Sequence, residues 1–272
     1  PGGAIGHIRR ILYRRRREKN GDFSGSSAAR APAVTAANEP EVSIVIPTRD
    51  RANLLAQCLK SIQGMTVYPR YNIVIVDNGS TQADALALLR DLAKQPNVHV
   101  VESPGRFNFS ALCNAGAHAT NSPVIVFLNN DTVIFQSGWL SALVEWAVKP
   151  GVGIVGAKLL FPDDRIEHAG VVLGHGGIAG HLYHRLPAAE PGYLGQLQFP
   201  HEVAAVTGAC IAVERKKFDA VGGFDADNLP VDLNDIDLCL RISDKGWATI
   251  WTPESVLYHL QSASRGFQFK HT

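Results

Sequence analysis

The chain has 272 residues, and its 46% hydrophobic and 19% charged content suits a substantial core rather than a disordered chain. The four cysteines form no C-x-x-C pair, and no apolar run approaches the roughly 20 residues of a membrane span, which argues against zinc, redox and membrane-spanning proteins. Seven Arg or Lys against one Glu give residues 1–20 a net charge of +6, which leaves −5 for the rest of the +1 total. We therefore expect a cytoplasmic protein with reduced cysteines and one basic end.

Residues 1–40 divide into a basic segment and a flexible linker. In residues 7–19, Ile8, Ile11 and Leu12 have helical spacing among the arginines. A short basic amphipathic helix of this type can lie on anionic lipid at the inner face of the plasma membrane, and a solvated charge run is the alternative interpretation. Residues 20–40 are rich in Gly, Ser, Ala and Pro, which indicates a linker without a core of its own.

The folded domain begins near residue 41 with alternating strands and helices. Continuous apolar runs predict buried strands at 42–47, 71–76, 98–101 and 124–128. Apolar residues at helical spacing and a run of small residues predict intervening helices over 54–62, 86–92 and 108–120. Strand–helix alternation is the pattern of a parallel α/β sheet built from right-handed crossovers.

After residue 139 the pattern changes. A helix at 140–148 is followed by glycine-rich, strand-like segments at 153–161, 170–180 and 203–213. A helix at 234–245 and a short strand at 248–251 complete the series. We expect this half to extend the first sheet as a mixed sheet, within one domain over 41–266 and with a tail at 267–272.

Polar residues follow three of the first four strands at one edge of the expected sheet. Open α/β sheets bind ligands outside the carboxyl ends of their strands. No G-x-G-x-x-G stands at the first turn and no P-loop is present, so a nucleotide here would be bound by another route. Asp131 suits a hard divalent cation, and a polar turn that ends the strand is the alternative. The residues concerned are Thr48-Arg49-Asp50, Asp77-Asn78 and Asn129-Asn130-Asp131.

Two acids stand at the start of the helix at 234–245. Asp235 and Asp237 are two residues apart and should point to different sides of the helix. One interpretation makes Asn234 the N-cap and the acids partners of the helix dipole. The other makes one carboxylate a general base that faces a cleft. His259 follows a short apolar strand. A lone histidine is more often a structural residue than a ligand, and only the presence of Asp131 makes His259 a candidate ligand.

Together these motifs resemble the family 2 glycosyltransferases with a GT-A fold, especially those of bacterial O-antigen and rhamnose-containing polysaccharide assembly. The order and spacing cover nearly all of residues 41–266. The matching stretches are Val-Ser-Ile-Val-Ile-Pro-Thr-Arg-Asp-Arg (42–51), Val-Asp-Asn-Gly-Ser (76–80), Phe-Asn-Phe-Ser-Ala-Leu-Cys-Asn (107–114), Phe-Leu-Asn-Asn-Asp-Thr (127–132), Ala-Val-Thr-Gly-Ala-Cys (205–210), Asn-Asp-Ile-Asp-Leu-Cys-Leu (234–240) and Ser-Ala-Ser-Arg-Gly (262–266).

The resemblance implies a nucleotide-sugar site at the first three polar strand ends. Pro47, Thr48 and Arg49 are expected to line the base pocket. Asp77 is expected to bind the base or the ribose, and Arg106 the diphosphate.

The resemblance also implies a catalytic centre. Asn130 and Asp131 stand where the family often has Asp-x-Asp, with Asp131 as the metal ligand and His259 completing the metal site. Asp235 matches the general base. Two departures suggest weaker metal binding: the first acid of the family is Asn129 here, and residues 258–261 read Tyr-His-Leu-Gln where relatives often have Tyr-His-His-Glu.

The implied activity is inverting, metal-dependent transfer of a hexosyl or deoxyhexosyl group in cell-surface polysaccharide synthesis. The donor would be a UDP- or dTDP-sugar with Mg²⁺ or Mn²⁺, and the acceptor a saccharide or lipid-linked saccharide; no nucleic-acid partner is expected. A catalytically weak nucleotide-sugar-binding module is the alternative. A sugar-nucleotide pyrophosphorylase would need a Gly-rich loop after the first strand, which is not there. Residues 174–180 form either a mobile acceptor-side loop or a hairpin with tight turns.

Overall fold

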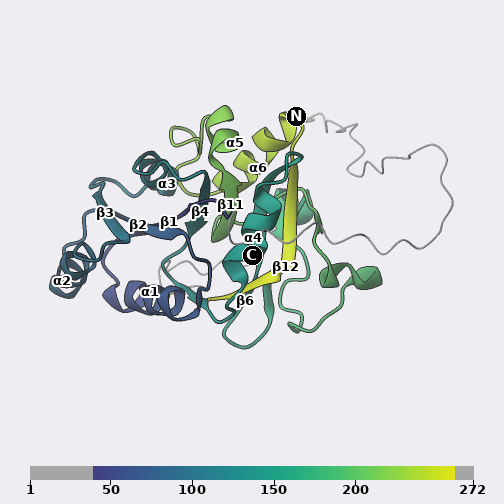
Figure 1. Ribbon diagram of the computed structural model, residues 1–272. Coiled ribbons are helices and arrows are strands. Elements are labelled where there is room, and N and C mark those ends of the chain that lie inside the picture. The colour runs from purple at the N-terminus through teal and green to yellow at the C-terminus, as the bar shows by residue number, and fades with distance from the viewer. Residues whose placement is uncertain (1–38, 261–272) are drawn as a thin grey trace, which may run out of the picture. The chain divides into compact units, whose positions relative to one another are not determined.

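The first half of the domain is an alternation of strands and helices, as the sequence predicts. The structure, a computed structural model, describes residues 39–260 (Figure 1). Four strands pair in parallel in the order β3-β2-β1-β4. They are β1 (Val42–Thr48), β2 (Tyr71–Asp77), β3 (Val98–Glu102) and β4 (Val124–Leu128). The helices between them are α1 (Ala52–Met65), α2 (Ala83–Leu92) and α3 (Phe109–His118).

The second half extends this sheet, as expected. The complete strand order is β10-β12-β6-β11-β4-β1-β2-β3, with β5 beside β12 and β7 beside β6, so both antiparallel and parallel pairs occur. The added strands are β5 (Thr132–Ile134), β6 (Val152–Leu160), β7 (Ile166–His168), β10 (His201–Glu202), β11 (Cys210–Glu214) and β12 (Ala248–His259). The helices are α4 (Trp139–Ala147), α5 (Arg215–Ala220) and α6 (Asn234–Asp244), with 3-10 turns η2 (His175–Gly177) and η3 (Tyr193–Gln198).

Two apolar cores sandwich the sheet. Helices α1 and α2 lie on one face, and α3, α5 and α6 lie on the other (Figure 1). Strand β4 is buried along its whole length because alternate side chains enter the two cores: Val126 joins the α1 side and Phe127 the α3 side. Phe127 packs against Phe218 and Phe224, with ring centroids 5.2 and 5.1 Å away. The continuous apolar run of β4 is thus explained by burial on both faces.

Three predicted strands in the second half have different bounds. The segment 170–180 is a hairpin of β8 (Val171–Leu173) and β9 (Ala179–His181), so the hairpin interpretation is confirmed. The segment 203–213 is a strand only from residue 210, because its first part leaves the sheet and Ala205 instead bridges to Val171. The short strand predicted at 248–251 is the beginning of β12, which continues past an irregularity between Thr252 and Val256 to His259.

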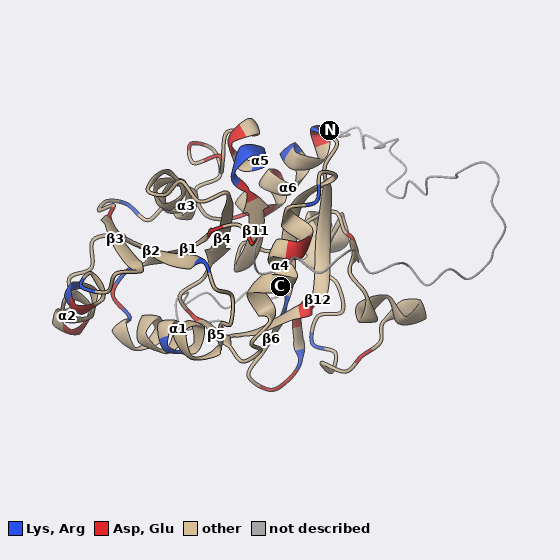
Figure 2. Cartoon of the chain, viewed as in Figure 1, with Lys and Arg blue, Asp and Glu red and all other residues tan. Residues whose placement is uncertain are grey.

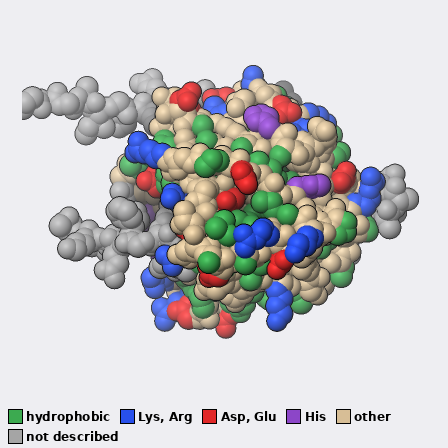
Figure 3. Space-filling model, turned by 90° about the vertical axis from the view of Figure 1, so that its left-hand side faces the viewer, with side chains coloured by type: hydrophobic (Ala, Val, Ile, Leu, Met, Phe, Trp, Pro, Cys, Tyr) green, Lys and Arg blue, Asp and Glu red, His purple; other side chains and the backbone are tan. Residues whose placement is uncertain are grey.

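Charged side chains lie mainly on the helices and loops, while β1 and β4 carry none (Figure 2). On the face shown in Figure 3, acidic and basic groups lie among apolar side chains. Within residues 39–260, no helix has the length and apolarity to cross a membrane. The basic segment and linker up to residue 38, the motif at 262–266 and the tail at 267–272 lie outside the described residues.

Candidate active site

The polar ends of β1, β2 and β4 meet at one edge of the sheet. Thr48 is paired with Asp77 in the parallel register of β1 and β2. The side-chain amide of Asn130 donates to Thr48 Oγ1 at 3.0 Å, which ties the end of β4 to the end of β1. All three side chains are buried, as is Pro47, so their positions are set by packing as well as by hydrogen bonds.

The loops after β1 and β2 are joined by carboxylates. Asp77 accepts hydrogen bonds from the backbone and the hydroxyl of Ser80. Asp50 Oδ1 accepts from the backbone N–H groups of Thr81 and Gln82, at 2.7 and 2.8 Å, at the start of α2. These hydrogen bonds from Gln82 and Thr81 lower the pKa of Asp50. In the sequence, Asp50 is only a polar residue after a strand. Its hydrogen bond from Thr81 N spans 31 residues and depends on the parallel pairing of β1 and β2.

The two arginines expected at the nucleotide lie at the surface. Arg49 is exposed directly after β1, and Arg106 is exposed in the loop after β3. Asn78 anchors that loop, because its side-chain amide donates to the carbonyls of Ser103 and Gly105 at 2.9 and 3.5 Å. Both guanidinium groups can therefore reach a ligand outside the sheet edge, on loops anchored to β1 and β2.

Asp131 and His259 come together in the described structure. Strand β12 pairs antiparallel with β5, so that His259 is opposite Thr132, the residue after Asp131. His259 Nε2 lies 3.1 Å from Asp131 Oδ1 and 3.3 Å from the amide nitrogen of Asn129. Asp131 and His259 are both buried. The structure therefore joins two groups that are 128 residues apart in the chain.

A third buried acid, Glu167 on β7, completes this cluster. Both of its carboxylate oxygens lie 2.8 Å from His259 Nδ1. Burial of His259 opposes its protonation, but hydrogen bonds to Asp131 and Glu167 outweigh that effect and raise the pKa of His259 to about 10. Glu167 is a functional candidate that the sequence pattern does not single out, since it is one acid between Ile166 and His168.

The donor set at Asp131 fits an incomplete divalent-cation site. A carboxylate oxygen and an imidazole nitrogen converge there, and both are ordinary ligands of divalent metals. Within residues 39–260 there is no group of three or more His, Cys, Asp or Glu side chains arranged to hold a metal. A cation at this position would thus take its remaining oxygen ligands from water or from a phosphate, which is how Mg²⁺ is commonly bound.

Asp235 lies at the start of α6, on the other side of the loop that precedes β11. Its Oδ2 accepts a hydrogen bond from Gly208 N at 2.8 Å. The next residue, Ala209, accepts from Asn129 N at 2.9 Å. Two consecutive residues of one loop thus contact Asp235 on one side and the end of β4 on the other. The base candidate and the metal candidates therefore border the same short loop.

Asp237 faces elsewhere, as the two-residue spacing predicts. It is ion-paired with Arg241, whose Nη1 also donates to the carbonyls of Val221 and Gly223. The prediction that Asn234 is the N-cap is wrong. Asn234 is the first helical residue, buried and hydrogen-bonded to Ser110 Oγ at 3.1 Å, and the cap position belongs to Leu233, which has a positive φ of 64°.

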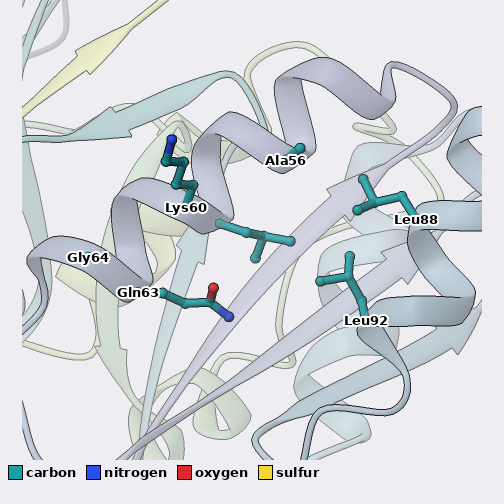
Figure 4. A pocket seen from close by; sticks show the side chains of 7 residues that line it. Ala56, Lys60, Gln63, Gly64, Leu88 and Leu92 are labelled. Carbon is teal, nitrogen blue, oxygen red and sulfur yellow. The ribbon is translucent and has the colours of Figure 1, made fainter.

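A separate apolar hollow of about 430 Å³ lies between α1 and α2 (Figure 4). None of its lining residues belongs to the predicted site. They are Ala56, Leu59, Lys60, Gln63, Gly64, Leu88 and Leu92.

The family model described as Glycosyl transferase family 2 matches residues 43–222. This chain belongs to glycosyl transferase family 2. The match contains the ends of β1, β2 and β4, the acid Glu167 and the loop at 207–209, while Asp235 and His259 lie beyond it.

Relatives of this family 2 chain include an O-antigen biosynthesis protein and a rhamnosyltransferase. It is 44% identical over 230 residues to Uncharacterized protein y4gI of Sinorhizobium fredii, and 37% identical over 227 residues to O-antigen biosynthesis protein RfbC of Myxococcus xanthus. These matches cover 84% and 83% of this chain but only 25% and 18% of those proteins. A third relative is N-acetylglucosaminyl-diphospho-decaprenol L-rhamnosyltransferase of Mycobacterium tuberculosis, 25% identical over 78% of this chain and 73% of that protein.

Solved structures confirm the GT-A fold of this family 2 chain. Mannosyltransferase PcManGT from Pyrobaculum calidifontis, in complex with GDP-Man and Mn²⁺, has a TM-score of 0.63 at 20% identity, covering 84% of this chain and 59% of that one. GalNAc-T7 with UDP, GalNAc and Mn²⁺ has a TM-score of 0.68 at 18% identity, covering 85% and 46%.

Proposed function

We propose that residues 41–266 form the catalytic domain of an inverting glycosyltransferase that uses a nucleotide-sugar donor in cell-surface polysaccharide synthesis. The observation that carries this proposal is the loop at 207–209. It contacts Asp235 through Gly208 and the end of β4 through Ala209, which supports a base on one side of it and a donor site on the other. Inverting transfer needs that arrangement, because the acceptor and the leaving group occupy opposite faces of the anomeric carbon.

The positions of the residues support the following roles. Asp235 takes the proton of the acceptor hydroxyl, whose oxygen then attacks the anomeric carbon as the nucleoside diphosphate leaves. Asp77 and Thr48 bind the nucleoside with the buried Pro47, and Asn130 supports Thr48 through its hydrogen bond. Arg49 lines the base pocket and Arg106 binds the diphosphate, each from an exposed position after its strand.

A divalent cation, Mg²⁺ or Mn²⁺, supplies positive charge that stabilises the diphosphate as it leaves. Asp131 and His259 Nε2 would hold it. Their 3.1 Å separation supports this assignment, and so does the presence of Mn²⁺ in the two related GT-A structures.

The names of the relatives support a saccharide or lipid-linked saccharide acceptor. One of these names describes transfer of a deoxyhexose. The Mycobacterium tuberculosis relative is named as an L-rhamnosyltransferase that acts on a diphospho-decaprenol carrier. We therefore propose a dTDP- or UDP-linked hexose or deoxyhexose as donor. The basic residues 9–19 would contact anionic lipid on the cytoplasmic face of the membrane.

The test is a screen of the chain with UDP-, dTDP- and GDP-sugars, with Mn²⁺ or Mg²⁺ and with saccharide acceptors. Release of free nucleoside diphosphate that depends on acceptor, and a product of inverted anomeric configuration by NMR, are the expected results. A second candidate is a binding module with little activity, which Asn129 in place of an acid favours because it lowers the negative charge beside Asp131. Donor binding without transfer, across the whole panel, would favour that candidate and contradict the enzyme.

A further inference from the structure

We propose that Glu167 is a positioning residue that fixes the tautomer and orientation of His259 for binding of a divalent cation. This inference rests on the proposed metal-dependent function and adds to it a residue that does not touch the cation. Its basis is the contact of both Glu167 oxygens with His259 Nδ1, at 2.8 Å each.

The contact decides which imidazole nitrogen can be a ligand. A carboxylate accepts hydrogen bonds, so the Nδ1 that faces Glu167 carries a hydrogen. Nε2 is then the nitrogen that turns to Asp131 Oδ1, 3.1 Å away, and its lone pair is open to a cation once its own proton leaves. Histidine ligands of metals commonly donate their second N–H to a carboxylate, which fixes the ring and increases its basicity.

An irregularity in the sheet places Glu167 where it can do this. Strand β7 pairs with β6 through Leu159 opposite His168 and Leu160 opposite Ile166, so Glu167 is the extra residue between two pairs. A bulge of this kind redirects one side chain. All three residues of β7 are buried.

The neighbours of Glu167 hold the bulge in place. The backbone N–H and carbonyl of Ile166 bond to Leu186 and Arg185, each at 2.7 Å. His181 Nδ1 lies 3.1 Å from the carbonyl oxygen of Glu167. His168, on the other side, accepts from Thr207 N at 3.3 Å through Nε2, so β7 also supports the loop that carries Gly208. Glu167 therefore lies on a supported backbone behind the site.

The experiment measures binding of Mn²⁺ alone to the chain by electron paramagnetic resonance, at one fixed neutral pH. Glu167→Gln should weaken Mn²⁺ binding roughly 10- to 100-fold, the usual effect of losing such a partner. His259→Ala should weaken it as well. In the His259→Ala background, Glu167→Gln should change Mn²⁺ affinity by less than about twofold, because the partner through which it acts is gone. Glu202→Gln, an exposed acid on β10, is the matched control and should bind as the wild type does.

Three outcomes would overturn the proposal. Equal Mn²⁺ affinity of the wild type and a folded Glu167→Gln variant would remove the positioning role and leave the metal site standing. An unchanged effect of Glu167→Gln without His259 would mean that Glu167 acts by another route, such as general stability. Absence of Mn²⁺ binding by the wild type would instead overturn the metal site itself. If Glu167→Gln does not fold, Glu167→Asp keeps the charge and withdraws it by one methylene, and the same loss and the same dependence on His259 are expected.

Discussion

Arg241 holds the carboxylate of Asp237, one turn away on α6, with Nε and Nη2 at 2.8 and 2.6 Å from Oδ2. The same guanidinium donates to two carbonyls of the segment before α6. The carboxylate of Asp237 therefore has a structural role. Asp235, two residues earlier, accepts a hydrogen bond from Gly208 N on one carboxylate oxygen and from Ile236 N on the other. Each oxygen keeps a further lone pair that can accept the proton of an acceptor hydroxyl.

This difference predicts opposite results for two matched substitutions. Asp235→Asn should leave folding and donor binding nearly unchanged, because an amide oxygen can still accept from Gly208, while transfer falls roughly 10²- to 10⁴-fold. Asp237→Asn should retain most transfer and lose about 0.2–1 kcal/mol of stability, the range for a partly exposed ion pair. Transfer rates at saturating donor and urea unfolding measure the two effects. Near-normal transfer by Asp235→Asn would make Asp237 the next candidate.

Asp131→Ala should abolish metal-dependent donor binding and leave the fold intact, because it removes the carboxylate that faces His259 Nε2. Calorimetric titration of a nucleoside diphosphate with Mn²⁺ or Mg²⁺ measures this. Asp163→Ala is the control, since Asp163 forms an exposed ion pair with Arg165. Metal-dependent binding that survives in Asp131→Ala would place the cation elsewhere.

Two buried histidines should be in opposite charge states in the metal-free chain. The pKa of His259 is raised to about 10, while burial, followed by His181 and His259, holds the pKa of His168 well below its usual value. Side-chain nitrogen NMR of the chelator-treated protein at neutral pH should therefore find a charged His259 and a neutral His168. The same charge state for both rings would contradict this assignment.

The raised pKa of His259 also predicts how the stability of the fold depends on pH. Because the folded pKa is above the usual 6.5, the contribution of His259 is fully present below that pH and is lost as the pH rises towards about 10. Unfolding by urea of the metal-free chain across this window should find a falling free energy of unfolding. A free energy that rises across the window would show that other groups dominate.

A chain that begins at Glu41 should fold and transfer sugar to a soluble acceptor, because the first strand begins at Val42. It loses the hydrogen bond from Tyr68 to the carbonyl of Pro40, which should cost about 0.5–1.5 kcal/mol of stability. A chain that begins at Glu39 retains Pro40 and is the control. Circular dichroism and nucleotide release measure folding and turnover. Failure of both shortened chains to fold would make the basic segment part of the core.

The first half of the fold and the family can be predicted from local features of the sequence. Apolar runs such as Val124–Leu128 are a local property, since a strand buried on both faces needs an unbroken apolar run. The polar residues after those strands were predicted to meet because parallel strands share one carboxyl edge, and Asn130 does reach Thr48. The ordered motifs carried the resemblance to family 2, which the family model confirms.

The way in which the second half completes the site depends on long-range contacts, which the sequence pattern does not reveal. The contact of Glu167 with His259 spans 92 residues and depends on a bulge in β7, and the contact of His259 with Asp131 depends on β12 reaching β5. Periodicity in a sequence reports which side of an element is buried. It does not report which elements become neighbours, because that depends on the sheet order and on where a strand departs from regular pairing.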